Sequence, residues 1–315
     1  MAIENELPQP EIELWPSWDD NNAYRLVCHF GWSEEASHAF ENEEIETLEL
    51  SGGSFLIPRL GKKALELKNL EIRTSGIVEG LEQFENIEEL TVEFLPENGL
   101  DLSLFPKLID LSFEREKSLE KQLDNLQGLR RILITGYSGT DCSVFPSMQQ
   151  LESLTLIQGR LRSLQGLESC HRLQELDLAL IRGLEDITAI HTLSGLKKLS
   201  LANLPKAEGT LKISRYPEIE FFYMVKSANL SVDMSGLRGH MGLRKLWLVG
   251  SVKKLDWPDV FTLPELEMVS LPEGPTPLDD DMLRSLATRH GKMMKSIQRT
   301  GPKRDRNILI KFHTV

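Results

Sequence analysis

Residues 151–180 read LESLTLIQGRLRSLQGLESCHRLQELDLAL, a stretch that contains one pattern of leucines twice. Leu151, Leu154 and Leu156 form an L-x-x-L-x-L motif, and the motif starts again 22 residues later at Leu173. This interval is too short for a domain and too long for the seven-residue repeat of a coiled coil. It suits one β-strand followed by a connection that returns the chain to the start of the next strand.

The motif can be followed through eleven copies, with steps of 20 to 24 residues between them. The first apolar positions of the copies are Ile45, Leu67, Ile87, Leu108, Leu129, Leu151, Leu173, Leu196, Ile219, Leu243 and Leu266. The last two apolar residues of each copy are two positions apart, so they point to the same side of a strand. A single coil has too little core to be stable alone, and we expect stacked coils to merge their leucines into one continuous core.

The segments between the copies carry apolar residues at a different spacing. Leu161, Leu164 and Leu167 are three residues apart, which indicates helical or 3₁₀ turns on the return path. Residues 118–126 (SLEKQLDNL) have enough such positions for a helical turn or two. Three copies, including the one at Leu108, are preceded by a proline two residues earlier, as at Pro106. Proline cannot extend a helix and therefore separates the return from the strand.

On these motifs, residues 45–274 resemble leucine-rich repeat proteins. The resemblance implies an α/β solenoid, a curved horseshoe of about eleven coils with a parallel sheet on its concave side and irregular helical or 3₁₀ returns on its convex side. Many such repeats place an asparagine or cysteine three residues after the third leucine, where it satisfies backbone groups in the turn. This sequence has neither residue at those positions, as Gly53, Ser75, Leu95 and Glu116 illustrate. We therefore expect irregular coils whose turns are satisfied in another way.

The two ends of the chain differ from the repeats, as the caps of a solenoid do. We predict an N-terminal cap at residues 1–44, the repeat solenoid at 45–274 and a C-terminal cap at 275–315. In YRLVCHF, alternation places Leu26, Cys28 and Phe30 on one face of a strand. The cap at the other end is expected to contain a helix in LDDDMLRSLATRH and a last strand in NILIKFH.

The net charge of −12 is unevenly distributed. Residues 1–50 contain thirteen acidic residues and one basic residue, whereas the rest of the chain is neutral. Residues 284–311 contain nine basic residues and one acidic residue. Charge that only keeps a protein in solution has no reason to separate in this way, so the acidic end is a candidate surface for a basic partner.

The sequence offers few signs of a membrane or an oxidising environment. It has no apolar run of about 18 residues, and MAIENELPQPEIELW lacks the basic and apolar segments of a secretory signal. The cysteines Cys28, Cys142 and Cys170 are odd in number and far apart, which favours free thiols in a reducing compartment. We expect a cytoplasmic protein.

No enzymatic motif is present. The chain lacks a phosphate-binding loop, a dinucleotide-binding glycine motif, a nucleophile elbow and a zinc-protease motif. The adjacent pairs at Cys28 and Cys170, each followed by histidine, do not chelate easily because neighbouring side chains of a strand point to opposite faces. The run Asp279–Asp281 fits the N-terminus of a helix better than a cation site. We expect no catalytic activity, no metal and no cofactor.

Residues that alternate with the buried leucines should form the concave face. In the first coils this face is predicted to be acidic, and in later coils it is predicted to be apolar and aromatic. The predicted partner-binding residues are Glu71, Glu89, Glu93, Asp110 and Glu114 in the acidic part and Phe221, Tyr223, Trp247, Val249 and Met268 in the aromatic part. Clustered exposed rings are typical of protein-binding hot spots. The alternative is that a cap folds over the rings and buries them.

These features favour a non-catalytic protein-binding module that grips a partner protein with its concave face and acidic N-terminal end. The chain resembles the acidic repeat proteins with which bacteria neutralise their own basic nuclease toxins, which implies an immunity protein that covers the active site of a toxin in a one-to-one complex. The alternative is a bacterial effector or a general scaffold or adaptor; an effector with a cysteine-dependent catalytic domain is disfavoured because residues 275–315 contain no cysteine. Direct binding of nucleic acid through residues 284–311 is disfavoured because the protein as a whole is acidic.

Overall fold

The computed structural model describes residues 8–17, 23–272, 279–300 and 307–313. By the density of its contacts the chain divides into two compact units, Met1–Ile134 and Thr135–Val315, which we call unit 1 and unit 2. Among the described residues, none of the helices combines the length and the apolar character that crossing a membrane requires.

Unit 1 begins with an antiparallel strand pair and continues with parallel strands. Its main strands, in sheet order, are β1 (Glu11–Pro16), β2 (Tyr24–His29), β3 (Ile45–Ser51), β5 (Asn69–Arg73), β7 (Glu89–Phe94), β8 (Asp110–Glu114) and β9 (Arg131–Thr135). The return segments contain β4 (Phe55–Leu56), η1 (Gly61–Leu65), β6 (Val78–Glu79), η2 (Leu81–Gln83), η3 (Leu102–Leu104), α2 (Lys117–Glu120) and η4 (Leu123–Asn125). Helix α1 (Glu34–Asn42) connects β2 to β3.

Unit 2 has the same organisation and ends in an antiparallel hairpin. Its main strands, in sheet order, are β10 (Ser153–Ile157), β11 (Glu175–Ala179), β12 (Lys198–Ala202), β14 (Phe221–Val225), β16 (Lys245–Leu248), β18 (Met268–Pro272), β20 (Asn307–Phe312) and β19 (Met294–Thr300). The returns contain η5 (Phe145–Ser147), η6 (Leu167–Ser169), η7 (Thr188–Thr192), η8 (Ile213–Arg215), η9 (Leu237–Gly239) and α3 (Trp257–Phe261). They also form a small parallel sheet of β13 (Gly209–Lys212), β15 (Leu230–Asp233) and β17 (Ser251–Lys253), and α4 (Asp280–Arg289) precedes the hairpin.

The structure confirms the leucine-rich repeat solenoid. Each of the eleven predicted copies provides one strand, from β3 to β18, and all three apolar positions of every copy are buried. The neighbouring strands pair in register, so that Leu154, Leu176 and Leu199 lie side by side in β10, β11 and β12. This alignment merges the apolar residues of successive coils into a continuous core.

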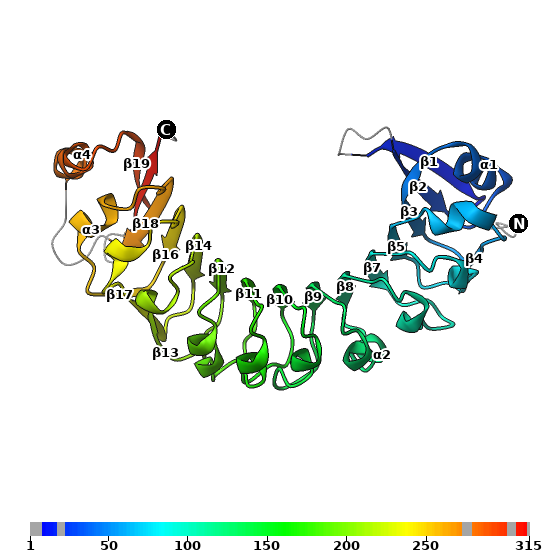
Figure 1. Ribbon diagram of the computed structural model, residues 1–315, viewed down its shortest axis with the longest axis horizontal. Helices are drawn as coiled ribbons and strands as arrows, with labels where there is room; N and C mark the ends of the chain where they lie inside the picture. Colours follow the sequence, from blue (N-terminus) through cyan, green and yellow to red (C-terminus); the bar gives the residue numbers. More distant parts are fainter. Residues whose placement is uncertain (1–7, 18–22, 273–278, 301–306, 314–315) are drawn as a thin grey trace, which may run out of the picture. The chain divides into compact units, whose positions relative to one another are not determined.

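The predicted returns are also confirmed. Leu161, Leu164 and Leu167 are fully buried on the return path, and Figure 1 shows the short helices of unit 2 on the opposite side of the coils from the main strands. Residues 118–126 include most of α2 and all of η4. Pro106 directly follows the residue that caps η3, which places it between the return and strand β8.

Backbone hydrogen bonds satisfy the turns after several strands, so these turns do not need the asparagine that many leucine-rich repeats place there. The residue that follows several strands adopts a left-handed conformation, with φ of 61° at Gln158, 61° at Leu180 and 57° at Asn203. Its N–H continues the hydrogen-bond ladder to the next coil: Gln158 donates to the carbonyl of Ala179 and Leu180 donates to that of Ala202, both at 2.8 Å. Residues other than glycine adopt the left-handed conformation at some cost in free energy. Here the backbone hydrogen bonds to the next coil stabilise it.

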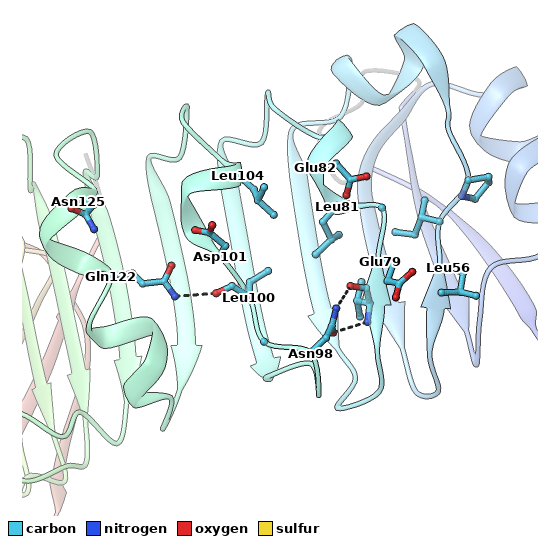
Figure 2. Close-up of a pocket in the computed structure, with 15 residues that line it drawn as sticks. Leu56, Glu79, Leu81, Glu82, Asn98, Leu100, Asp101, Leu104, Gln122 and Asn125 are labelled. Atoms are coloured by element: carbon cyan, nitrogen blue, oxygen red, sulfur yellow. Dashed lines mark hydrogen bonds between the residues drawn. The ribbon is translucent and has the colours of Figure 1, made fainter.

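Side-chain amides satisfy other backbone groups on the return path of unit 1. Asn98 bridges both backbone groups of Val78 in the preceding coil, at 3.0 Å to its N–H and 2.8 Å to its carbonyl. Gln122 accepts from the N–H of Leu102 at 2.8 Å and donates to the carbonyl of Leu100 at 2.9 Å. Figure 2 shows Asn98 and the hydrogen bond from Gln122 to Leu100 among the residues that line a pocket. Polar ladders therefore exist, but at positions that the family pattern does not predict.

Both ends of the chain match the predictions in part. Leu26 and Cys28 are buried as expected, but the placement of Phe30 on the same face is wrong. Strand β2 ends at His29, and the left-handed Phe30 (φ 59°) leaves its ring 42% exposed. At the other end, α4 and β20 confirm the predicted helix and strand, with Asp279 accepting from the N–H of Met282 at 2.7 Å.

Strand β19, which no sequence pattern predicted, pairs with β20 and lies at one edge of the sheet. The boundaries at residues 1–44, 45–274 and 275–315 stay a prediction. Parts of both caps lie outside the described residues.

Candidate protein-binding surface

Two groups of side chains project from the main sheets on the face opposite the leucine core. In unit 1 the acidic surface consists of Glu49, Glu71, Glu89, Glu93, Asp110 and Glu114. In unit 2 the aromatic surface consists of Phe221, Tyr223, Trp247, Val249 and Met268. Alternation along each strand places these residues away from the core, as the sequence predicts.

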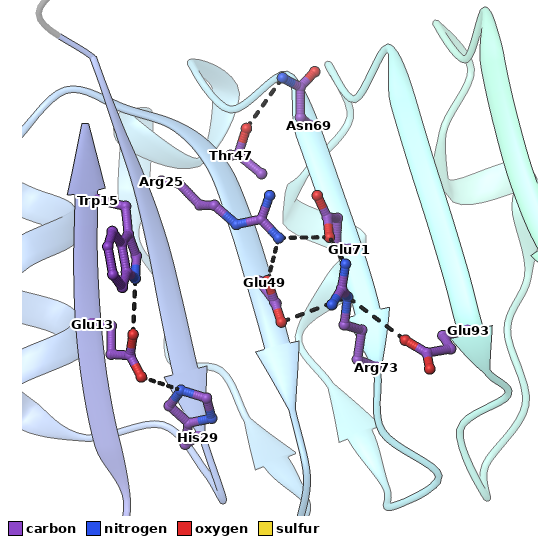
Figure 3. Close-up of polar contacts among 10 residues, drawn as sticks. All are labelled: Glu13, Trp15, Arg25, His29, Thr47, Glu49, Asn69, Glu71, Arg73 and Glu93. Atoms are coloured by element: carbon purple, nitrogen blue, oxygen red, sulfur yellow. Dashed lines mark hydrogen bonds and ion pairs between the residues drawn. The ribbon is translucent and has the colours of Figure 1, made fainter. Parts of the chain in front are cut away.

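Arginines cross the strands of the acidic surface. Arg25 in β2 donates to the carboxylate of Glu49, and its Nη2 also lies 2.8 Å from Oε2 of Glu71. Arg73 approaches the same pair from β5, with Nη2 3.0 Å from Glu71 and Nε 3.6 Å from Glu49, and Nε lies 3.7 Å from Glu93 (Figure 3). Glu49 is only 7% exposed. The two arginines compensate the negative charge of this buried carboxylate.

A second arginine group lies in the following coils. Arg131 in β9 donates through Nε to Asp110 at 2.6 Å and through Nη2 to Glu89 at 3.0 Å. The pKa of Glu89 is raised by partial burial and then by the negative charge of Asp110, while Arg131 opposes the shift. Glu114 lies 3.5 Å from Nη1 of Arg115.

The structure therefore places all predicted acidic residues on one face but surrounds them with counter-charges that the sequence analysis left out. One of these counter-charges, Arg131, could have been predicted from the sequence. Arg131 occupies the same motif position as Glu89 and Asp110, and in-register parallel strands bring equal positions together. Six carboxylates share four arginines, so the acidic surface keeps a negative charge that is smaller than the acids alone would give.

The rings of the aromatic surface form a short stack. Phe221 and Tyr223 have ring centroids 6.3 Å apart and nearly parallel planes, at 15°. Tyr223 and Trp247 are register partners in β14 and β16, with centroids 6.2 Å apart at 44°. All three side chains are half-buried, and Val249 beside them is 37% exposed. The rings thus keep part of their surface accessible.

Lysines flank the rings along the strand register. Lys198 in β12 and Lys245 in β16 are the register partners of Phe221 on its two sides. Lys198 lies 3.8 Å from Glu175, and Lys245 is exposed. A partner that covers the rings would therefore also meet positive charge at this edge of the aromatic surface, which the sequence analysis did not include.

The described residues contain no group of three or more potential ligands that could hold a metal ion. Burial raises the pKa of Cys28 to about 12 and that of Cys170 to about 11, and it also raises the pKa of Cys142. Thiols with such pKa values are poor nucleophiles at neutral pH because the thiolate is the reactive form.

No protein-family model matches the sequence, and the search of curated proteins found no match. Solved structures are similar at low identity. An internalin from Listeria monocytogenes has 14% identity, with 77% of this chain and 85% of the internalin covered and a TM-score of 0.48. A leucine-rich repeat protein from Leptospira interrogans has 12% identity, 76% and 74% coverage and a TM-score of 0.48.

A third similar structure is the leucine-rich repeat ectodomain of a plant membrane receptor kinase from Arabidopsis thaliana, in complex with Casparian strip integrity factor 2. It has 17% identity, and the match covers 82% of this chain and 36% of the receptor with a TM-score of 0.46. Similarities of this size do not assign a function.

Proposed function

We propose that this chain is a non-catalytic protein-binding module that holds a partner protein against the open face of its sheet. The observation that carries the proposal is the half-buried stack of Phe221, Tyr223 and Trp247, with Val249 and Met268 beside it. Aromatic rings held rigidly by a sheet give a large contact area at little cost in side-chain entropy, and such rings dominate the binding energy of many interfaces.

The finer proposal concerns the partner. We propose a basic protein, and specifically a nuclease toxin whose active site is covered in a one-to-one complex, so that this chain acts as an immunity protein in the cytoplasm. A nuclease needs a basic cleft to bind phosphates. The acidic N-terminal fifty residues and the excess of carboxylates over arginines on the acidic surface support a partner of that charge. The three free, buried cysteines are consistent with a reducing compartment.

The first experiment tests the protein-binding role. The chain is immobilised and its affinity is measured for the product of the adjacent reading frame. Alanine variants of Phe221, Tyr223 and Trp247 are each expected to weaken binding by about 2 kcal/mol, or about thirtyfold in Kd, because truncation empties the centre of the contact. Met241→Ala is the matched control, since Met241 is 63% exposed and lies on a return segment of the same unit.

The second experiment separates the immunity role from the alternatives. If the partner is a nuclease toxin, one equivalent of the chain should abolish its cleavage of DNA or RNA. A partner that binds through the rings but has no nuclease activity would support a bacterial effector or a general scaffold instead. If all three alanine variants bind as tightly as the unmodified chain, the aromatic surface is not the binding site.

A further inference from the structure

A cavity of about 650 Å³ opens on the sheet face at the start of unit 1. It lies over the first three strands, with Glu13 and Trp15 from β1, Val27 and His29 from β2, and Glu49 from β3 among its lining residues. Figure 3 shows Trp15, Glu13 and His29 on one side and the group of Arg25 and Glu49 on the other. The cavity is therefore bounded by an aromatic ring on one side and by carboxylates on both.

Trp15 is the most exposed aromatic ring in the described part of unit 1. Its side chain is 56% exposed on β1, which is an edge strand of the sheet. The indole N–H donates to Oε2 of Glu13 at 2.8 Å, and this contact fixes the ring at the cavity. An indole held in place beside a cavity offers its face to a ligand without a further loss of side-chain freedom.

Glu13 differs from the carboxylates of the acidic surface. Among the described residues its polar contacts are the indole N–H of Trp15 and Nε2 of His29, which lies 3.1 Å from Oε1. No lysine or arginine of the described residues lies within ion-pair distance of it, whereas Glu49 and Glu71 both contact arginines. A carboxylate has about four acceptor positions, so Glu13 can accept further hydrogen bonds. Its side chain is 51% exposed and can be reached from the cavity.

We propose that this cavity binds an arginine side chain of the partner protein. A guanidinium group is planar and cationic, so it can stack on the Trp15 indole and donate to Glu13 at the same time. Its methylene chain would pack against Val27, which also lines the cavity. An anion would face the carboxylate of Glu13, and a neutral apolar side chain would cover Glu13 without pairing it.

Arg25 also lines the cavity, but it does not remove the preference for a cationic ligand. Its guanidinium is already engaged by Glu49 and Glu71, so it contributes little free positive charge to the cavity. The inference rests on the proposed function in its choice of a basic protein as the source of the arginine. The cavity itself can be tested without any partner.

The test is a titration of the full-length chain, labelled with ¹⁵N at its tryptophans, with Nα-acetyl-L-arginine amide. The indole N–H signal of Trp15 is the readout, because that group lies at the cavity and bonds to Glu13. The arginine probe is expected to shift this signal saturably at millimolar concentration, and the neutral isostere Nα-acetyl-L-citrulline amide is expected to bind at least about tenfold more weakly.

Two variants test whether the charge of Glu13 is responsible for binding the arginine probe. Glu13→Gln keeps the shape of the side chain and removes its charge, so it should weaken the arginine probe by about tenfold or more. Glu85→Gln changes an exposed acid that does not line the cavity and should leave the titration unchanged. The proposal is overturned if the arginine probe causes no saturable shift, if citrulline binds equally well, or if Glu13→Gln binds like the unmodified chain.

The outcome is independent of the aromatic surface. Alanine variants of the rings in unit 2 test whether a protein binds there, and their result does not affect the arginine titration. If the rings prove inactive while the probe binds at Trp15, the arginine site stands and the aromatic surface, on which the proposed function rests, is not the binding site. If the probe does not bind while the ring variants lose their partner, the arginine site is rejected and the protein-binding role of the aromatic surface stands.

Discussion

Replacing one central leucine tests whether stacked apolar rows hold the solenoid together. Leu176 in β11 is fully buried, and its register partners are Leu154 in β10 and Leu199 in β12. Leu176→Ala leaves the backbone of the strand unchanged but removes most of a side chain that contacts the coils before and after it. Both interfaces of that coil should lose packing, because each coil of a solenoid is stabilised by its two neighbours.

The expected loss can be worked out from the burial of Leu176. Removing three buried carbon groups costs about 0.8 kcal/mol each in transfer free energy, or roughly 2.4 kcal/mol together. The cavity left behind adds about 24 cal/mol for each Å³ that does not collapse. Rows of leucine on both sides limit the collapse, so a residual cavity of about 50 Å³ would add roughly 1.2 kcal/mol. We expect the free energy of unfolding to fall by about 3–4 kcal/mol.

Urea unfolding followed by circular dichroism and by tryptophan fluorescence measures this loss. Both probes should show the same shift of the midpoint with an unchanged slope, because neighbouring coils unfold together. Met241→Ala, at a 63% exposed position of the same unit, should change stability by less than about 0.5 kcal/mol. A loss below about 1 kcal/mol for Leu176→Ala, or separate midpoints for the two probes, would refute the continuous core.

Three further predictions address pH, capping and charge. Burial lowers the pKa of His240, so its imidazole takes up a proton less readily in the folded chain than in the unfolded chain. Stability should therefore fall as the pH drops below the ordinary histidine value of about 6.5, and His240→Gln should flatten that fall in thermal unfolding curves. Asp279→Ala removes the cap of α4 and should cost about 1 kcal/mol in urea unfolding. Reversing the charge of Glu89, Glu93 and Glu114 by substitution with lysine should slow association with the partner and reduce the salt dependence of the association rate. Stopped flow between about 0.1 and 1 M salt measures this rate. If the rate of the unmodified chain does not depend on salt, a basic partner is excluded.

The repeat itself could be predicted from the sequence because it depends on local periodicity. Two apolar residues two positions apart select one face of a strand, and the 20- to 24-residue step places each strand beside the previous one. These rules located the three buried apolar positions of each of the eleven copies and placed Glu89, Asp110, Phe221 and Trp247 on the opposite face. They need no knowledge of distant residues.

The electrostatics and the cavity depend on the tertiary structure. Arg25 meets Glu71 across 46 positions of sequence, and Arg131 meets Glu89 across 42, because each pair lies within three neighbouring strands. The cavity at Trp15 exists only because β1 turns back antiparallel to β2, which a repeat pattern beginning at Ile45 cannot indicate. Periodicity determines which way a side chain points along its own strand, whereas its neighbours across the sheet are set by pairing between distant segments.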